Sequence, residues 1–252
     1  MRGIVVVLGF CLGTSGIAGE PFKLESRSES PLLVELYTSE GCSSCPPAEK
    51  WLSGFLDNPN LWTKVVPVAF HVDYWDRLGW KDPFANRENT LRQYRLRDEG
   101  AIRSIYTPGF VVDGREWRGW FEGERLDFQN SHSAKGRLVV GIEAGELNAM
   151  YSNSEAGMLL NVALLGIGLE SKVTRGENRG RQLAHNFVAL VHQEHPLIKG
   201  KASFALDRIR VDAATRWGIA LWVVSPGATE PEIVLGNWVP KEAVMLKPVR
   251  SE

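Results

Sequence analysis

The chain has few cysteines and no excess of charge of either sign. Its 252 residues include three cysteines, 29 Lys and Arg, and 30 Asp and Glu, which gives a formal net charge of −1. A charge this close to zero provides no electrostatic basis for binding nucleic acid or an anionic membrane. We therefore expect partners of another kind.

Long apolar runs are also missing, apart from a short one at the N-terminus. Arg2 precedes apolar residues 4–12, and small residues follow at 16–18. This stretch is too short to span a bilayer, and its order of features is typical of an export signal. We expect residues 1–18 to be removed together with Cys11. The mature protein would then have no membrane span and would be exported, in a periplasmic setting where disulfides persist.

The pattern of strands and helices changes near residue 136. Before it, the apolar runs 32–37 and 65–72 suit buried parallel strands. After it, short strand-like segments alternate with Gly, Asn, Ser or Pro, which is typical of an antiparallel sandwich. The sequence predicts two domains: an α/β domain over 19–135 and a β-rich domain over 136–252.

A helix is expected after the second apolar run. Asp82 is a good helix N-cap, and Pro83 fits the first turn because its missing N–H is not needed there. The pattern then continues to about Asp98 and stops at Gly100.

Cys42 and Cys45 lie between the first apolar run and a helix start. Pro46 and Pro47 follow them and fit best in the first turn of that helix. A dithiol at such a junction is the arrangement of a thiol–disulfide exchange site. The partial positive charge of the helix N-terminus favours a thiolate at Cys42. We expect Cys42 to be the attacking and more exposed thiol and Cys45 to be the resolving thiol.

Two other roles for the dithiol remain open. As an inert clip, a four-residue loop stabilises a protein by only about 1.9 kcal/mol. As a zinc half-site it lacks a second cysteine pair, and His192 and His195 would point to opposite sides of a strand. We expect no cofactor and no metal. The alternative is a thiol-based metal-binding or scaffold module without redox turnover.

Accessory residues are expected where the second apolar run ends. Sites form at the carboxyl ends of strands in open α/β sheets, so His71 and Asp73 are candidates for proton transfer. Trp75 and Trp80 are candidates for the wall of a substrate groove. The alternative is that the aspartate caps a loop and the tryptophans fill the core.

A polar, glycine-broken segment over 175–185 is rich in arginine. Such segments are usually solvated turns. The functional interpretation is that the segment bends over the dithiol, with Arg175 and His185 as accessory residues that favour the thiolate.

Several longer motifs resemble domain-of-unknown-function family 1223, a group of mostly exported bacterial proteins with a thioredoxin-like fold. They cover nearly all of the expected mature chain, at residues 35–49, 70–76, 79–84, 106–108, 112–115 and 175–185. The dithiol and the Thr107–Pro108 pair also resemble the thioredoxin superfamily. That resemblance implies that Cys42 attacks, that Cys45 resolves, and that Pro108 is a cis-proline facing the dithiol.

The same resemblance has two further implications. The Thr107 backbone would pair with an extended substrate segment, as an added strand pairs with a sheet edge. Ser43 and Ser44 stand where well-known members have other residues, so the direction of exchange stays open.

The fold class expected from pattern and resemblance is an α/β thioredoxin-like domain followed by an all-β, sandwich-like domain. The expected function is thiol–disulfide exchange with protein or small-molecule thiols and disulfides as partners. Cys42, Cys45, Thr107 and Pro108 would form the centre of the site.

Overall fold

A computed structural model describes residues 21–128, 132–207 and 213–244. The expected export signal over 1–18 lies outside these residues. No helix in the described ranges is long and apolar enough to cross a membrane.

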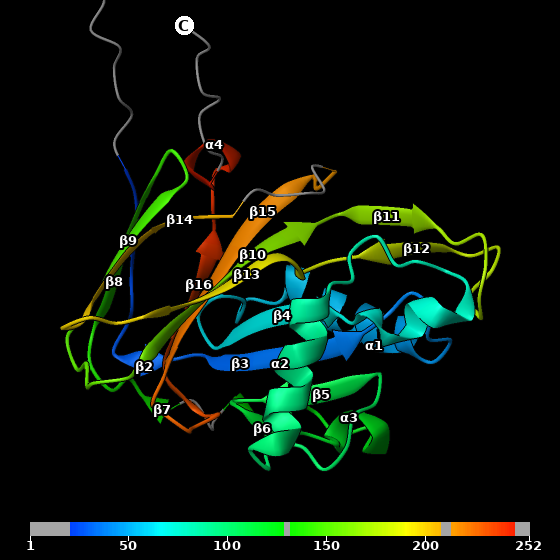
Figure 1. Ribbon diagram of the computed structural model, residues 1–252, viewed down its shortest axis with the longest axis horizontal. Helices are drawn as coiled ribbons and strands as arrows, with labels where there is room; N and C mark the ends of the chain where they lie inside the picture. Colours follow the sequence, from blue (N-terminus) through cyan, green and yellow to red (C-terminus); the bar gives the residue numbers. More distant parts are fainter. Residues whose placement is uncertain (1–20, 129–131, 208–212, 245–252) are drawn as a thin grey trace, which may run out of the picture.

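One eight-stranded sheet forms the centre of the molecule (Figure 1), with strand order β16-β15-β10-β13-β4-β3-β5-β6. β3 and β4 pair in parallel, and β13 joins the other edge of β4 in parallel through Val188 and Ala69. The remaining pairs in the sheet are antiparallel. The strands are β3 (Leu32–Thr38), β4 (Val65–His71), β5 (Gly109–Val112), β6 (Arg115–Glu116), β10 (Leu159–Ile167), β13 (Val188–Pro196), β15 (Arg216–Val224) and β16 (Pro231–Trp238).

This sheet shows that the expected fold class is wrong. An α/β thioredoxin-like domain followed by a separate β domain would keep the strands of 19–135 and 136–252 in different sheets. Instead, four strands from each side of residue 136 share one sheet, and the protein is built mainly of strands. The reason is that the free edge of β4 is fully buried and needs backbone partners, which β13 supplies.

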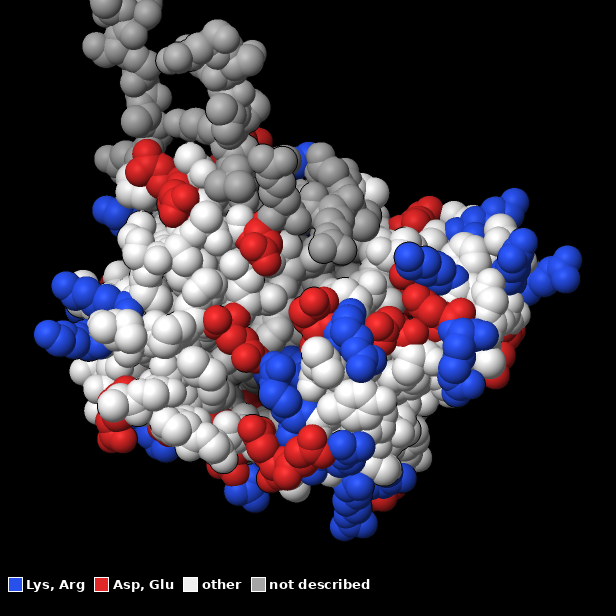
Figure 2. Space-filling model, in the orientation of Figure 1, with Lys and Arg blue, Asp and Glu red and all other residues white. Residues whose placement is uncertain are grey.

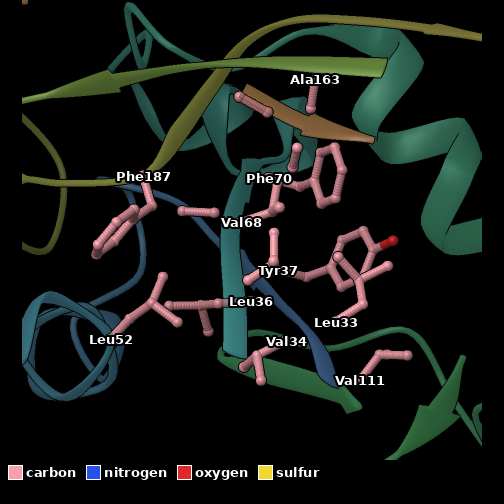
Figure 3. Close-up of a cluster of buried hydrophobic side chains, with 14 of the residues drawn as sticks. Leu33, Val34, Leu36, Tyr37, Leu52, Val68, Phe70, Val111, Ala163 and Phe187 are labelled. Carbon is pink, nitrogen blue, oxygen red and sulfur yellow. The ribbon is translucent and has the colours of Figure 1, made fainter. Parts of the chain in front are cut away.

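Two helices cover opposite faces of the central strands. They are α1 (Cys45–Ser53) and α2 (Arg87–Asp98). Side chains alternate along β3, so Leu36 packs beside Leu52 of α1, whereas Leu33 and Tyr37 point to the other face (Figure 3). On that second face, Arg92 of α2 donates two hydrogen bonds of 2.9 Å to the buried Glu35 carboxylate. β3 is therefore buried on both sides.

A second sheet covers the outer strands of the first. Its order is β1-β8-β9-β14, and all of its pairs are antiparallel. A separate apolar core lies between this sheet and β10, β13, β15 and β16. The strands are β1 (Phe22–Glu25), β8 (Leu138–Glu143), β9 (Glu146–Tyr151) and β14 (Lys201–Ala205).

Short elements complete the described fold. β11 (Leu169–Lys172) and β12 (Gln182–His185) form a two-stranded arm, and β12 runs beside α1 (Figure 1). The other short elements are β2 (Glu29–Ser30), η1 (Gly54–Asp57), η2 (Asp73–Leu78), α3 (Gly119–Glu122), β7 (His132–Ser133) and α4 (Lys241–Val244).

Charge is mixed on the surface in view. Acidic and basic side chains lie close to one another on this face and do not form a large area of a single sign (Figure 2). This agrees with the near-zero net charge of the sequence.

Candidate functional site

Cys42 and Cys45 form a disulfide at the start of α1. Helix formation begins at Cys45 because Pro46 and Pro47 occupy first-turn positions that need no N–H donor. The cysteines are 1% and 0% exposed, while Ser43 is exposed. The expected greater exposure of Cys42 is thus absent from this conformation, and a partner has to displace part of the cover to reach either sulfur.

The segment before β5 lies directly against the disulfide. The Thr107–Pro108 peptide bond is cis, as predicted. The carbonyl oxygen of Thr107 is 3.7 Å from the Sγ of Cys42. Trp75 donates from Nε1 to the Thr107 hydroxyl at 2.8 Å. Gly41 permits this arrangement, because a Cβ there would lie 2.8 Å from the Cβ of Trp75.

The segment between β11 and β12, residues 173–181, covers the dithiol from another side, and we call it the latch loop. Glu177 accepts a 2.9 Å hydrogen bond from the backbone N–H of Ser43. Asn178, only 1% exposed, donates to the carbonyl oxygens of Glu40 and Cys42 at 2.8 and 2.9 Å. These contacts attach the latch loop to the dithiol loop.

Arg175 lies in the latch loop but is exposed. Among the described residues it makes no hydrogen bond or ion pair with the dithiol loop. The charged side chain that does reach this loop is the carboxylate of Glu177. The positive charge expected from Arg175 therefore remains a prediction without a contact.

A buried network lies behind the dithiol and centres on His185. Its Nε2 is 2.8 Å from Glu40, and its Nδ1 contacts Glu49. The Thr38 hydroxyl donates to Glu49 at 2.6 Å, and Trp80 donates from Nε1 to Glu40 at 2.6 Å. His185 of β12 is thereby tied to α1 and to the dithiol loop.

His71 lies beside this network at the end of β4. Its Nδ1 is 2.7 Å from Asp82, whereas its buried Nε2 has no hydrogen-bond partner. Asp82 also accepts the backbone N–H groups of Glu40 and Phe84 at 2.8 and 2.9 Å. The carboxylate of Asp82 thus fixes the orientation of the His71 ring.

The network carries buried charge. Burial by itself lowers the pKa of His185, but the Glu49 charge and the hydrogen bonds to Glu40 and Glu49 outweigh it and raise this pKa to about 10. Burial likewise opposes the Asp82 charge at His71, and the net result is a raised pKa. The pKa of Glu49 is lowered because His185 outweighs burial. His185 is therefore cationic at neutral pH, and the Asp82 carboxylate favours the cationic form of His71.

Glu49, His71 and His185 also form a group of potential metal ligands. One donor atom from each lies within 4.8 Å of the other two, and all three residues are buried. The group contains neither cysteine. Asp73, by contrast, pairs with the hydroxyl of Thr90 on α2 at 2.6 Å, which is the loop-capping role.

The carboxylates and the amide that build this site were not predicted from the sequence. Glu40 and Glu49 lie inside the dithiol motif, and Glu49 is four residues after Cys45, on the same face of α1. That spacing was the available signal. Asp82 was interpreted as a helix cap, and nothing local distinguishes Asn178 from other polar residues of its loop.

Comparisons with known proteins give a family and a fold. The family model "Protein of unknown function (DUF1223)" matches residues 33–224. A crystal structure of a protein from Agrobacterium tumefaciens has a TM-score of 0.58 at 22% identity and covers 88% of this chain and 100% of that one. HBP35 of Porphyromonas gingivalis has a TM-score of 0.54 at 12% identity and covers 90% of this chain and 79% of that one. No curated protein matches the sequence.

Proposed function

Because the chain belongs to the DUF1223 family, which is described as being of unknown function, we propose a function from the site: thiol–disulfide exchange through Cys42 and Cys45. The observation that carries the proposal is the disulfide at the N-terminus of α1, with the Thr107 backbone 3.7 Å from Cys42. The order of strand, dithiol, helix and Thr-Pro is similar to that of the thioredoxin superfamily. We infer the chemistry from this site and not from the whole fold.

The dithiol loop can stabilise a thiolate once the disulfide is reduced. The helix N-terminus contributes partial positive charge, and the Ser44 hydroxyl is 3.3 Å from the Sγ of Cys42 and can donate to it. A thiolate is the species that attacks a disulfide. These groups favour Cys42 as the sulfur that forms the mixed disulfide with a partner.

The exchange takes two steps, in which bonds, protons and electrons balance. A partner thiolate attacks Cys42, the Cys42–Cys45 bond breaks, and Cys45 leaves as a thiolate that takes up a proton. A second partner thiol then loses its proton and attacks the partner sulfur joined to Cys42, which releases Cys42 as a thiolate. The partner dithiol is oxidised to a disulfide, and this protein is reduced by the same two electrons. The reverse sequence reduces a partner disulfide.

Access to Cys42 requires the latch loop to move. The disulfide is buried, and the hydrogen bonds from Asn178 hold the dithiol loop under its cover. We propose that a partner reaches Cys42 only after these bonds open. The wall formed by Trp75 and Thr107 then lies beside the exposed sulfur and contacts the partner.

A disulfide that never exchanges is the competing function, and burial of both cysteines favours it. The same opening of the latch loop separates the two candidates. A structural disulfide reacts only when the whole protein unfolds, whereas an exchanging one reacts in the folded protein.

We also propose export, with residues 1–18 as the signal. The oxidising setting that export provides is the one in which a dithiol is kept as a disulfide. N-terminal sequencing of the protein recovered outside the cytoplasm tests this, with a new N-terminus near residue 19 as the expected result.

The test of exchange uses single-cysteine variants in a Cys11→Ser background. In the Cys45→Ser variant, the Cys42 thiolate should attack oxidised glutathione under native conditions, release one reduced glutathione and remain in a stable mixed disulfide, because no resolving thiol remains. The matched control is Cys42→Ser, in which the buried Cys45 should label much more slowly. Mass spectrometry counts the adducts. Equal labelling of both variants, or none before denaturation, would leave the non-exchanging disulfide as the function.

A further inference from the structure

A group of buried side chains behind the dithiol has the composition of a transition-metal site. Glu49 comes from α1, His71 from the end of β4 and His185 from the end of β12. One donor atom of each lies within 4.8 Å of the other two. The exposed fraction is 6% for Glu49, 0% for His71 and 1% for His185.

The second observation is the unpartnered nitrogen of His71. Nδ1 pairs with Asp82 at 2.7 Å, so the nitrogen left for a ligand is Nε2, which is buried and has no hydrogen-bond partner. Leaving a buried polar atom unpaired costs about 1–3 kcal/mol. A metal ion bound here would displace the proton from Nε2. With Nδ1–H still donating to Asp82, Nε2 then offers the lone pair through which a histidine binds a metal ion.

Each imidazole has a carboxylate beside the ring nitrogen that is not proposed as a metal ligand. Asp82 accepts from His71, and Glu40 lies 2.8 Å from Nε2 of His185, which leaves Nδ1 of His185 on the Glu49 side. Histidines that bind metal ions almost always donate their other ring N–H to such a partner, which fixes the tautomer and the ring orientation. Trp80 in turn holds Glu40 at 2.6 Å.

The charge of the cluster also suits a cation. Once a metal ion has displaced the protons of the two imidazoles, the carboxylates of Glu40, Glu49 and Asp82 leave three negative charges in the protein interior. A divalent ion offsets two of them without a counter-ion from solvent, and buried charges need such compensation.

The donor set selects the class of metal. Two imidazoles and one carboxylate are the protein ligands of many zinc enzymes, with bonds of about 2.0–2.2 Å. Mg²⁺ and Ca²⁺ prefer sites made of oxygen ligands, and Cu(I) prefers sulfur. We propose that Glu49, His71 and His185 bind one divalent transition-metal ion, Zn²⁺ in the first instance, behind the dithiol and without its sulfurs.

Such an ion would join α1, β4 and the β11–β12 arm. It would therefore brace the surface on which the dithiol loop and the latch loop rest. The proposal is independent of exchange, because a metal ion bound here requires no reduction of the disulfide. To reach the spacing of a tetrahedral site, the most distant donor atoms would have to approach by at most about 1.5 Å, and Nδ1 of His185 and the Glu49 carboxylate, which are in direct contact, would have to separate to admit the ion.

The experiment uses the full chain with Cys11→Ser and with the Cys42–Cys45 disulfide confirmed intact, so that no thiolate is present. After treatment with a chelator, the protein is equilibrated with Zn²⁺ during refolding, since the site is buried. We expect one Zn²⁺ per chain and a higher melting temperature. Co²⁺ in its place should give absorption bands of a nitrogen- and oxygen-ligated ion without sulfur charge transfer.

Variants assign the ion to the cluster. His71→Gln and Glu49→Gln should each weaken Zn²⁺ binding at least 100-fold, and Asp82→Asn, which removes only the partner of His71, should weaken it 10–100-fold. His192→Gln, at a half-buried histidine on β13 outside the cluster, is the matched control and should bind as the parent does. If a ligand variant does not fold, Asp82→Asn and the Co²⁺ spectrum of the parent decide. Absence of stoichiometric binding, or binding that none of these variants weakens, overturns the proposal.

Discussion

Removing the Asn178 side chain should accelerate reduction of the disulfide in the folded protein. Asn178→Ala deletes the two hydrogen bonds that join the latch loop to the carbonyl groups of Glu40 and Cys42. It also deletes the acceptor of a 2.8 Å hydrogen bond from Arg181. The two bonds to Glu40 and Cys42 have to break when the latch loop opens, so the variant lowers the free energy of opening.

The magnitude follows from the two buried bonds. A typical hydrogen bond contributes about 0.5–1.5 kcal/mol net, so the pair contributes about 2 kcal/mol to holding the latch loop closed. A change of 1.4 kcal/mol corresponds to a factor of ten, so the open population, and with it the reduction rate, should rise about 30-fold. Asn178→Asp lacks the same donors and should act in the same direction.

The assay measures the rate of reduction by dithiothreitol under native conditions, with alkylation and mass spectrometry. Urea unfolding in parallel reports the global free energy of unfolding. Gln182→Ala, on the exposed face of β12, is the matched control and should leave the rate unchanged. If Asn178→Ala lowers global stability while the reduction rate in the folded state stays at the parent value, the latch loop does not control access.

Three further results are expected. Arg92→Met leaves the buried Glu35 carboxylate without its cationic partner and should lower the free energy of unfolding in urea by about 3–5 kcal/mol. A loss below about 1 kcal/mol contradicts this. Burial and the nearby charge of Arg92 hold the pKa of His192 well below its usual value, so it stays neutral in the folded state. Stability should therefore fall by up to about 1.4 kcal/mol per pH unit below about pH 6.5, and less steeply in His192→Phe; equal slopes refute the assignment. Gly41→Ala should push Trp75 away and change its fluorescence, and an unchanged spectrum and melting temperature argue against the close contact.

The local sequence pattern was sufficient to predict the central strands β3 and β4. The apolar runs 32–37 and 65–72 correspond to β3 and β4 within one residue, because strands buried on both faces are continuously apolar. The start of α2 was placed at Asp82 instead of Arg87. Asp82 has the right side chain for a cap, but it accepts hydrogen bonds from His71 and Glu40, and Asn86 caps the helix.

The order of strands in the sheet could not be predicted from the local sequence pattern, because strands far apart in the sequence pair with each other. Nothing in the sequence near Val188 indicates that β13 lies beside β4 and not in a sheet of its own. The residues of the site likewise include some that local motifs predict and some that they do not. Cys42, Cys45 and Pro108 were identified from short motifs, whereas the contacts of Glu40 and Glu49 with His185 join residues more than 130 positions apart.

The most direct test of exchange at Cys42 and Cys45 is the redox equilibrium of the disulfide in the folded protein. The full chain with Cys11→Ser is equilibrated in glutathione buffers of graded potential, quenched with acid and alkylated, while circular dichroism confirms that it stays folded. We predict reversible reduction with a midpoint between about −120 and −270 mV, the range of exchange-active dithiols. A disulfide that stays oxidised below about −300 mV, and is reduced only when the protein unfolds, would contradict it.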